Sequence, residues 1–234
     1  MNSRSDKYEM KPYRYDLHIH SKFSDGLSTI NEITDRAHVL HLEGIAITDH
    51  FWPSLGSRHG GKSIIENRRR QIEKRRIIFP DMLILDGVEV DIQSNGEFAP
   101  VDGGLSQFDV VIGSFHWKTD STHWASALQK SLRIQDFHIL GHWDGYLSSY
   151  KEEDGELAAR LLADAEVAIE LSSRYVTEYP DFFENARDVG CKFTLGSDSH
   201  NIETLGQLEF QRKLAVDYEL EMLDPHNLKQ LFDR

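Results

Sequence analysis

Short apolar segments alternate along this chain with longer segments whose apolar residues recur at helical spacing. Most of the apolar segments have no polar face, which is typical of buried strands in a parallel sheet. The pattern predicts seven strands, at 15–20, 44–48, 82–90, 108–114, 138–141, 167–171 and 193–197. It predicts helices after Thr29 and at 63–78, 121–133, 152–164 and 180–189.

Local signals fix some of the helix ends. Thr29 and Glu32 have the spacing of a capping box, which predicts that the first helix begins directly after Thr29. Gly190 follows the helix predicted at 180–189 and is expected to end it. The pair Asp224 and Pro225 is expected to open a final short helix.

Strands that alternate with helices predict a parallel sheet covered by helices on the outside, in one α/β domain. The chain has neither a Gly-x-Gly-x-x-Gly turn nor a phosphate loop, so a closed barrel is favoured over a dinucleotide-binding fold. In such a barrel, functional residues are expected at the carboxyl ends of the strands.

Charge and composition narrow the classes of function. The chain has 26 Lys and Arg against 39 Asp and Glu, a net charge of −13, which argues against binding of nucleic acid. No segment approaches the roughly 18 apolar residues of a membrane span, so no membrane association is expected. The single cysteine, Cys191, and a start without the pattern of a signal peptide favour the cytoplasm.

Side chains that bind metals recur at the ends of the predicted strands. His18 and His20 alternate along the first strand, and Asp198 and His200 follow the last strand with the same spacing, so each pair can converge on one site. The nine candidate ligands are His18, His20, Asp25, His50, Glu89, His116, His142, Asp198 and His200. Asp49 lies among them but points elsewhere, either to support a ligand or as a structural cap.

Nine nitrogen and oxygen ligands without a thiolate suit two or three divalent ions of zinc, manganese or iron. Neighbouring ions can share a bridging hydroxide, which attacks phosphorus while the ions bind the phosphoryl oxygens. The same ligands also serve acyl chemistry, so the residues alone do not choose between phosphoester and amide bonds.

The ligand-bearing segments resemble, in order, the motifs of the polymerase and histidinol phosphatase (PHP) metallohydrolases. The resemblance extends from about residue 15 to 206, and the histidinol phosphatase branch is more similar than the polymerase branch. The motifs are DLHIHSKFSDG at 16–26, IAITDH at 45–50, GVE at 87–89, GSFH at 113–116, LGH at 140–142 and GSDSH at 196–200.

The resemblance implies a distorted seven-stranded (β/α)7 barrel resembling a TIM barrel, with a domain at 15–234 that follows an N-terminal extension at 1–14. It also implies three metal sites. These would use His18, His20, Glu89 and Asp198; Glu89, His116 and His142; and Asp25, His50 and His200. The interval between His116 and His142 is short compared with that of the histidinol phosphatases, in which this region helps to cover the pocket.

Several other polar residues have either a chemical or a structural interpretation. Arg174 is predicted to be catalytic by binding the substrate phosphate, and Asp198 is predicted to be catalytic as a metal ligand. Lys118 is expected to be solvated, and Glu170 either orients a ligand histidine or points outward. The arginine-rich segment 68–76 is expected to be a solvated outer helix. The histidines outside the ligand set are expected to be structural or exposed, and His59 is the one most easily placed near a barrel site.

The leading hypothesis is a metal-dependent phosphoesterase that hydrolyses a small phosphate monoester, with histidinol phosphate as the substrate that the resemblance implies. One alternative is a PHP-type phosphodiesterase or exonuclease acting on nucleotides or single strands. Another is a metal-binding regulatory domain without catalysis. Oligomeric state is not indicated by the sequence.

Overall fold

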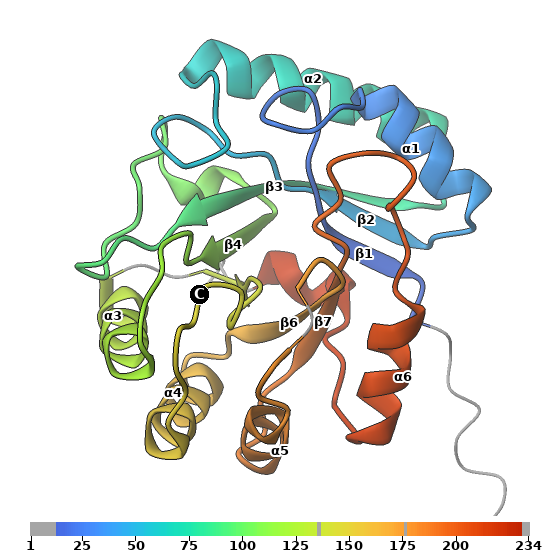
Figure 1. Cartoon of the computed structure of the whole chain (residues 1–234). Helices are drawn as coiled ribbons and strands as arrows, with labels where there is room; N and C mark the ends of the chain where they lie inside the picture. Colours follow the sequence, from blue (N-terminus) through green and yellow to red (C-terminus); the bar gives the residue numbers. More distant parts are fainter. Residues whose placement is uncertain (1–12, 135–136, 176, 231–234) are drawn as a thin grey trace, which may run out of the picture.

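All neighbouring strands are parallel, and they follow one another around the sheet in chain order (Figure 1). The computed structural model describes residues 13–134, 137–175 and 177–230. The strands are β1 Tyr15–Ile19, β2 Gly44–Ile47, β3 Leu83–Asp91, β4 Val110–Ser114, β5 Ile139–Leu140, β6 Ala168–Ser172 and β7 Phe193–Gly196.

The first and last strands approach each other at their carboxyl ends. Ile19 forms a parallel bridge with Ser199, and the backbone N–H of His20 donates to the carbonyl of Ser199 at 2.8 Å. These contacts almost close the sheet into a barrel of seven strands, which confirms the predicted fold. They also bring the residues that follow β1 and β7 to the same place.

Helices surround the strands on the outside of the barrel (Figure 1). They are α1 Ile30–Val39, α2 Lys62–Ile78, α3 Ser121–Ile134, α4 Glu152–Asp164, α5 Asp181–Asp188 and α6 Glu209–Asp217. The predicted capping box is confirmed, because the Thr29 side chain accepts from the Glu32 N–H while the Glu32 carboxylate accepts from the Thr29 N–H. Gly190, at φ +87°, follows the end of α5 as predicted.

One α-helix, α6, and the 3₁₀ helix η1 at Leu105–Gln107 were not predicted. The segment that forms α6 begins after Leu208, which gives no side-chain cap, and only Gln211 and Ala215 of the helix are buried. Without a cap or a continuous apolar face, the sequence gives little sign of a helix there. The short helix predicted at Pro225 is present as a 3₁₀ helix, η2, over Pro225–Gln230.

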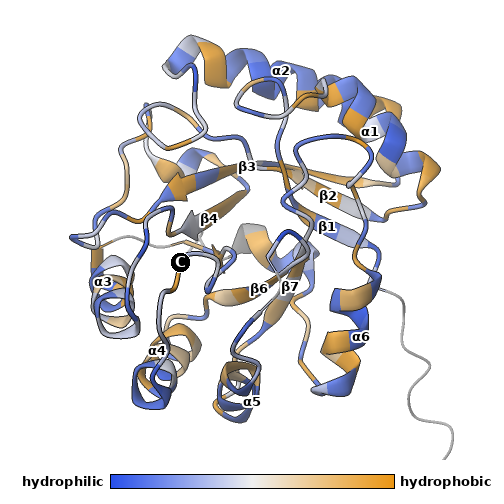
Figure 2. Ribbon diagram, viewed as in Figure 1, coloured by the Kyte–Doolittle hydropathy of each residue, from blue (hydrophilic) through white to orange (hydrophobic). Residues whose placement is uncertain are grey.

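Apolar side chains from β1 to β6 form one of the buried clusters, and Leu228 of η2 is part of it. Figure 2 shows β2, β3 and β6 as mostly apolar, while the surrounding helices carry both apolar and polar residues. The barrel interior is thus filled below the carboxyl ends of the strands, and the polar residues described next lie above this packing.

Of the helices in the described part of the chain, none combines the length and apolar character that crossing a bilayer requires. The predicted division between an extension at 1–14 and a domain at 15–234 stays a prediction, and residues 1–12 lie outside the described residues.

Candidate metal centre

A single carboxylate, that of Glu89 on β3, lies at the centre of the candidate site. Its Oε2 is 2.9 Å from His18 Nε2, 3.2 Å from His20 Nε2 and 3.3 Å from His50 Nε2. Its Oε1 is 3.0 Å from His142 Nε2 and 3.4 Å from His116 Nε2. Five imidazoles from the ends of four strands, β1, β2, β4 and β5, therefore surround one carboxylate that is 1% exposed.

A second group of side chains adjoins this centre where β1 and β7 meet. Asp198 Oδ1 is 3.3 Å from His20 Nε2 and 3.5 Å from His200 Nδ1. His200 Nε2 lies 3.1 Å from Asp25 Oδ2. All nine predicted ligand residues are thus gathered at the carboxyl ends of the strands.

Eight of the nine side chains fall into three sets of donor atoms that lie within 4.8 Å of one another, and His142 belongs to none of these sets. The sets are His18, His20, Glu89 and Asp198; His20, Asp25 and His200; and His50, Glu89 and His116. The first equals a set that the resemblance implies. The other two sets differ from the implied ones. His20, rather than His50, lies with Asp25 and His200, and His50, rather than His142, lies with Glu89 and His116.

Unusual backbone conformations hold two of these residues. Asp198 has φ +50° and His142 has φ +23°, a region that non-glycine residues rarely adopt. The backbone N–H of His142 donates to Glu170 Oε2 at 2.7 Å, and Glu170 Oε1 lies 2.7 Å from His18 Nδ1. Glu170 of β6 therefore points inward and fixes two candidate ligands, the orienting one of the two roles weighed for it.

Asp49 does not join the donor sets and instead organises the loop after β1. Its carboxylate accepts from the Ser21 N–H at 2.7 Å and from the hydroxyls of Ser21 and Ser24 at 2.8 and 2.7 Å. This loop leads directly to Asp25. Asp49 therefore supports the position of a candidate ligand, the first of the two roles considered for it.

Arg68 of α2 holds Asp49 in turn, and the prediction of a solvated arginine-rich helix was wrong for it. Its side chain is 0% exposed and pairs with Asp49, at 3.1 Å, and with Asp86. Arg75 is also buried and pairs with Asp35. A run of charges along a helix does not reveal which of them meet carboxylates of a neighbouring strand, so these contacts could not be predicted from the sequence.

Charges in the centre shift the pKa values of its imidazoles. Burial lowers the pKa of His20, but its contacts with Asp198 and Glu89 outweigh burial and raise it to about 9. Burial likewise lowers the pKa of His116, and the charge of Glu89 with the hydrogen bond to Asp91 raises it to about 10. For His50, burial dominates and lowers the pKa to about 4. The carboxylates of Glu89, Asp91 and Asp198 therefore favour the protonated, positively charged forms of His20 and His116.

The donor atoms fit divalent metal ions. The Nδ1 of His142 is buried and forms no hydrogen bond to the described residues, and His20 Nε2 lies 3.2 and 3.3 Å from two carboxylate oxygens without a hydrogen bond to either. Buried polar atoms without partners are costly, and a cation coordinated by them would remove that cost. Imidazole nitrogens and carboxylate oxygens without a thiolate match zinc, manganese or iron.

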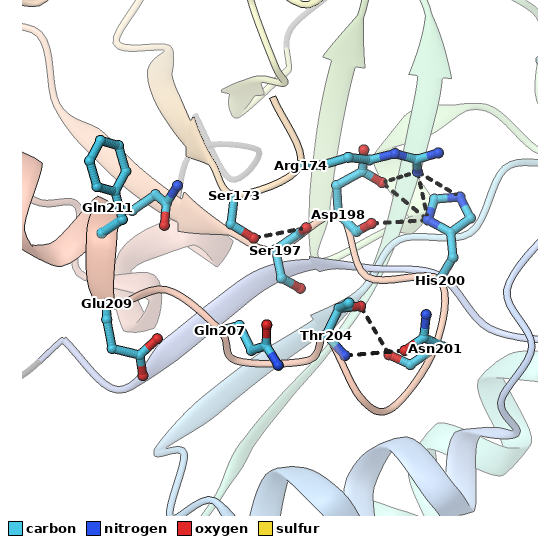
Figure 3. A pocket seen from close by; sticks show the side chains of 11 residues that line it. Ser173, Arg174, Ser197, Asp198, His200, Asn201, Thr204, Gln207, Glu209 and Gln211 are labelled. Carbon is cyan, nitrogen blue, oxygen red and sulfur yellow. Dashed lines mark hydrogen bonds and ion pairs between the residues drawn. The ribbon is translucent and has the colours of Figure 1, made fainter. Parts of the chain in front are cut away.

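Arg174 lies beside the centre, in the loop after β6. Its Nη1 is 3.2 Å from Asp198 Oδ1 and 2.7 Å from His200 Nδ1, and its side chain is about half exposed (Figure 3). A cavity of about 640 Å³ opens next to these three residues. The guanidinium therefore reaches both the candidate ligands and an open space that could admit a substrate.

Two tyrosines that the sequence analysis did not single out lie at the other side of the centre. The ring of Tyr175 is 4.9 Å from that of His142, and the ring of Tyr146 is 5.7 Å from that of His116. The two hydroxyls are 3.4 Å apart. They form an aromatic wall beside the imidazoles.

The remaining candidates lie outside the centre, as expected. Lys118 and His59 are exposed. His138 is buried, and its Nδ1 accepts from the Val111 N–H at 2.9 Å. Cys191 packs in the core, where its thiol donates to the Ala159 carbonyl and burial raises its pKa to about 11.

Comparison with known proteins gives a family for this arrangement. The PHP domain family matches residues 16–183. DNA polymerase/3′-5′ exonuclease PolX of Bacillus subtilis (strain 168) is 26% identical over 208 residues, which cover 86% of this chain but only 36% of PolX. Probable phosphatase YcdX of Shigella flexneri serotype 5b (strain 8401) is 27% identical over 231 residues, covering 90% of this chain and 89% of YcdX.

A solved structure has a similar fold. The histidinol phosphate phosphatase HISK of Lactococcus lactis, in complex with zinc, L-histidinol and phosphate, superposes with a TM-score of 0.69. The two are 20% identical, and the superposition covers 90% of this chain and 95% of HISK.

The chain belongs to the PHP domain family, which confirms the resemblance seen in its motifs. The family and these relatives place it among hydrolases that act on phosphoesters.

Proposed function

We propose that this protein is a metal-dependent phosphatase that hydrolyses a small phosphate monoester in the manner of a histidinol phosphatase. The observation that carries the proposal is the group of five imidazoles around Glu89, with Asp25, Asp198 and His200 alongside. This donor set would hold two or three divalent ions, and Glu89 belongs to two of its groups of donor atoms.

In this proposal, different residues hold the metal ions and the substrate. The nine candidate ligands would hold the metals. One of them, Asp198, lies 3.2 Å from Arg174. Divalent ions in such a site supply a nucleophile at neutral pH and stabilise the charge that develops on phosphoryl oxygens. Arg174 contributes two parallel N–H donors that suit phosphate, and it faces the cavity.

The substrate proposed first is histidinol phosphate, the substrate named for HISK of Lactococcus lactis. A cavity of about 640 Å³ is the size of a small-molecule site. A small phosphorylated alcohol is therefore the proposed partner of this chain.

The similarity to PolX supports a second candidate function, namely hydrolysis of phosphodiesters in nucleotides or in single-stranded nucleic acid, because the match spans 86% of this chain. The net charge of −13 weakens this candidate, since it repels polyanions over long range.

Phosphate release from histidinol phosphate by manganese-loaded protein tests the proposal, with p-nitrophenyl phosphate and single-stranded oligonucleotides as parallel substrates. A kcat/KM above roughly 10⁴ M⁻¹s⁻¹ on histidinol phosphate, far above the generic ester, is expected. The Asp198→Asn variant should be folded and inactive. Release of mononucleotides alone would favour the second candidate, and a metal-loaded protein that hydrolyses none of them would indicate a regulatory domain.

A further inference from the structure

The cavity beside Arg174 extends away from the metal centre, between the loops after β6 and β7 and the start of α6 (Figure 3). Its end at the centre is formed by Arg174, Asp198 and His200. Its far end is formed by Gln207, Glu209 and Gln211. A substrate whose phosphate lies at the centre would therefore place its leaving group against these three residues.

Oxygen atoms dominate the far end. Gln211 donates from Nε2 to the Ser172 carbonyl at 3.0 Å, and Gln207 donates from Nε2 to the Glu203 carbonyl at 2.7 Å. These bonds fix the amide nitrogens, so the amide oxygens point into the cavity from either side, as Figure 3 shows. The Glu209 carboxylate lies between them along the chain and adds a negative charge.

Positive charge is confined to the other end. Among the lining residues, all of which are described, Arg174 alone is cationic. Arg212 approaches Glu209 from outside the cavity, with 3.6 Å between Nη1 and Oε1. The Glu209 side chain is 82% exposed, and an ion pair as exposed as this contributes little to stability. The Glu209 carboxylate therefore remains available to a ligand.

Hydroxyl groups along the cavity are already used within the protein. The Ser173 hydroxyl donates to the Ser197 carbonyl at 3.3 Å, and the Ser197 hydroxyl donates to the His18 carbonyl at 3.4 Å. Thr204 Oγ1 lies 3.0 Å from the hydroxyl oxygen of Ser199. The groups left for a leaving group are thus mainly hydrogen-bond acceptors. The Asn201 side chain adds one donor, its amide nitrogen, because its oxygen already accepts from the Glu203 and Thr204 N–H groups.

We propose that this cavity selects phosphorylated alcohols whose leaving group carries an ammonium or hydroxyl donor, and that it rejects leaving groups with a carboxylate. The proposal rests on the phosphatase function and adds the residues that set its specificity. Gln207, Glu209 and Gln211 accept hydrogen bonds from the leaving group, while Arg174 remains with the phosphate. Selection arises because a carboxylate would lie unpaired against three acceptors.

Two small phosphates of similar size test the charge preference, namely 2-aminoethyl phosphate and phosphoglycolate. With the manganese-loaded full chain, kcat/KM for 2-aminoethyl phosphate should exceed that for phosphoglycolate by roughly tenfold. Glu209→Gln should narrow this ratio by roughly twofold to fivefold. Glu203 is an exposed carboxylate in the loop before α6 and does not line the cavity, so Glu203→Gln should leave this ratio unchanged. Equal values for both phosphates, or equal effects of both variants, would overturn the proposal.

Calorimetric binding of the same two phosphates separates this inference from the proposed function. Tighter binding of 2-aminoethyl phosphate, weakened by Glu209→Gln, together with no hydrolysis of any monoester would contradict the phosphatase function and support the cavity's preference. Hydrolysis of both phosphates, together with equal binding of the two, would support the phosphatase function and contradict the cavity's preference.

Discussion

Glu170 joins His18 to His142 through its two carboxylate oxygens. Oε1 lies 2.7 Å from His18 Nδ1, and Oε2 accepts from the backbone N–H of His142 at 2.7 Å. A carboxylate on Nδ1 fixes the tautomer that leaves Nε2 free for a metal, and His18 Nε2 is the atom that faces Glu89. One side chain that binds no metal itself thereby orients two candidate ligands.

Glu170→Gln is expected to weaken metal binding by roughly 10- to 100-fold, because the amide supports the imidazole less well and its nitrogen cannot accept from His142. Competition with a chelator measures the affinity. Glu156→Gln, an exposed carboxylate on α4, is the matched control and should bind metal like the parent protein. Equal affinity of Glu170→Gln and the parent would refute the orienting role.

Gly196→Ala tests the same contact from the other side. A Cβ at residue 196 would lie 1.8 Å from Glu170 Oε1 and 2.8 Å from the His18 Cβ, so Glu170 must move. We expect a loss of stability of about 1–3 kcal/mol and weaker metal binding, seen as a lower Tm and in the chelator assay. Gly113→Ala, whose new Cβ meets only side chains at 3.1 Å, should retain metal affinity. An unchanged affinity of Gly196→Ala would mean that Glu170 does not position the ligands.

Arg68→Met removes the cation that Asp49 and Asp86 share in a buried site. Breaking such a pair costs about 3–5 kcal/mol, because Asp49 stays buried with hydrogen bonds but no cation, and Asp86 keeps only its pair with Arg69. Arg75→Met is the control on the same helix, since its ion-pair partner Asp35 is 61% exposed and can be solvated. Urea unfolding should show a distinctly larger loss for Arg68→Met. Losses of equal size would show that burial of the helix, and not the two carboxylates, sets the cost.

His138 gives the fold a sensitivity to acid that is independent of the metal centre. Burial lowers its pKa to about 4, so between about 6.5 and 4 the unfolded chain binds a proton that the folded protein does not. Stability should therefore fall as the pH falls through this window, by roughly 3 kcal/mol in all. His138→Gln retains an acceptor for the Val111 N–H and should flatten the dependence of the unfolding free energy on pH. An unchanged slope would contradict this assignment.

Periodicity accounts for most of the fold and for the position of the ligands. The alternation of His18 and His20 placed both on the face toward Glu89, and the Thr29 capping box fixed the start of α1. These signals are local, since each depends on residues within one strand or one helical turn.

The parts that the sequence did not reveal depend on contacts between distant segments. Arg68 meets Asp86 from a helix whose composition is that of a solvated surface, and α6 begins without a cap. The inward direction of Glu170 depends on the exact end of β6 relative to β5 and β7, which spacing leaves open. The pairing of His50 with His116 rather than with Asp25 and His200 follows from loop geometry in the same way.

A titration of chelator-treated protein with manganese, followed by phosphate release from histidinol phosphate, tests the central claim most directly. The proposal predicts no release without metal and a rise that saturates at two or three ions per chain, with no rise in Asp198→Asn. Release at the full rate from metal-free protein, or saturation of metal binding without any release, would contradict it.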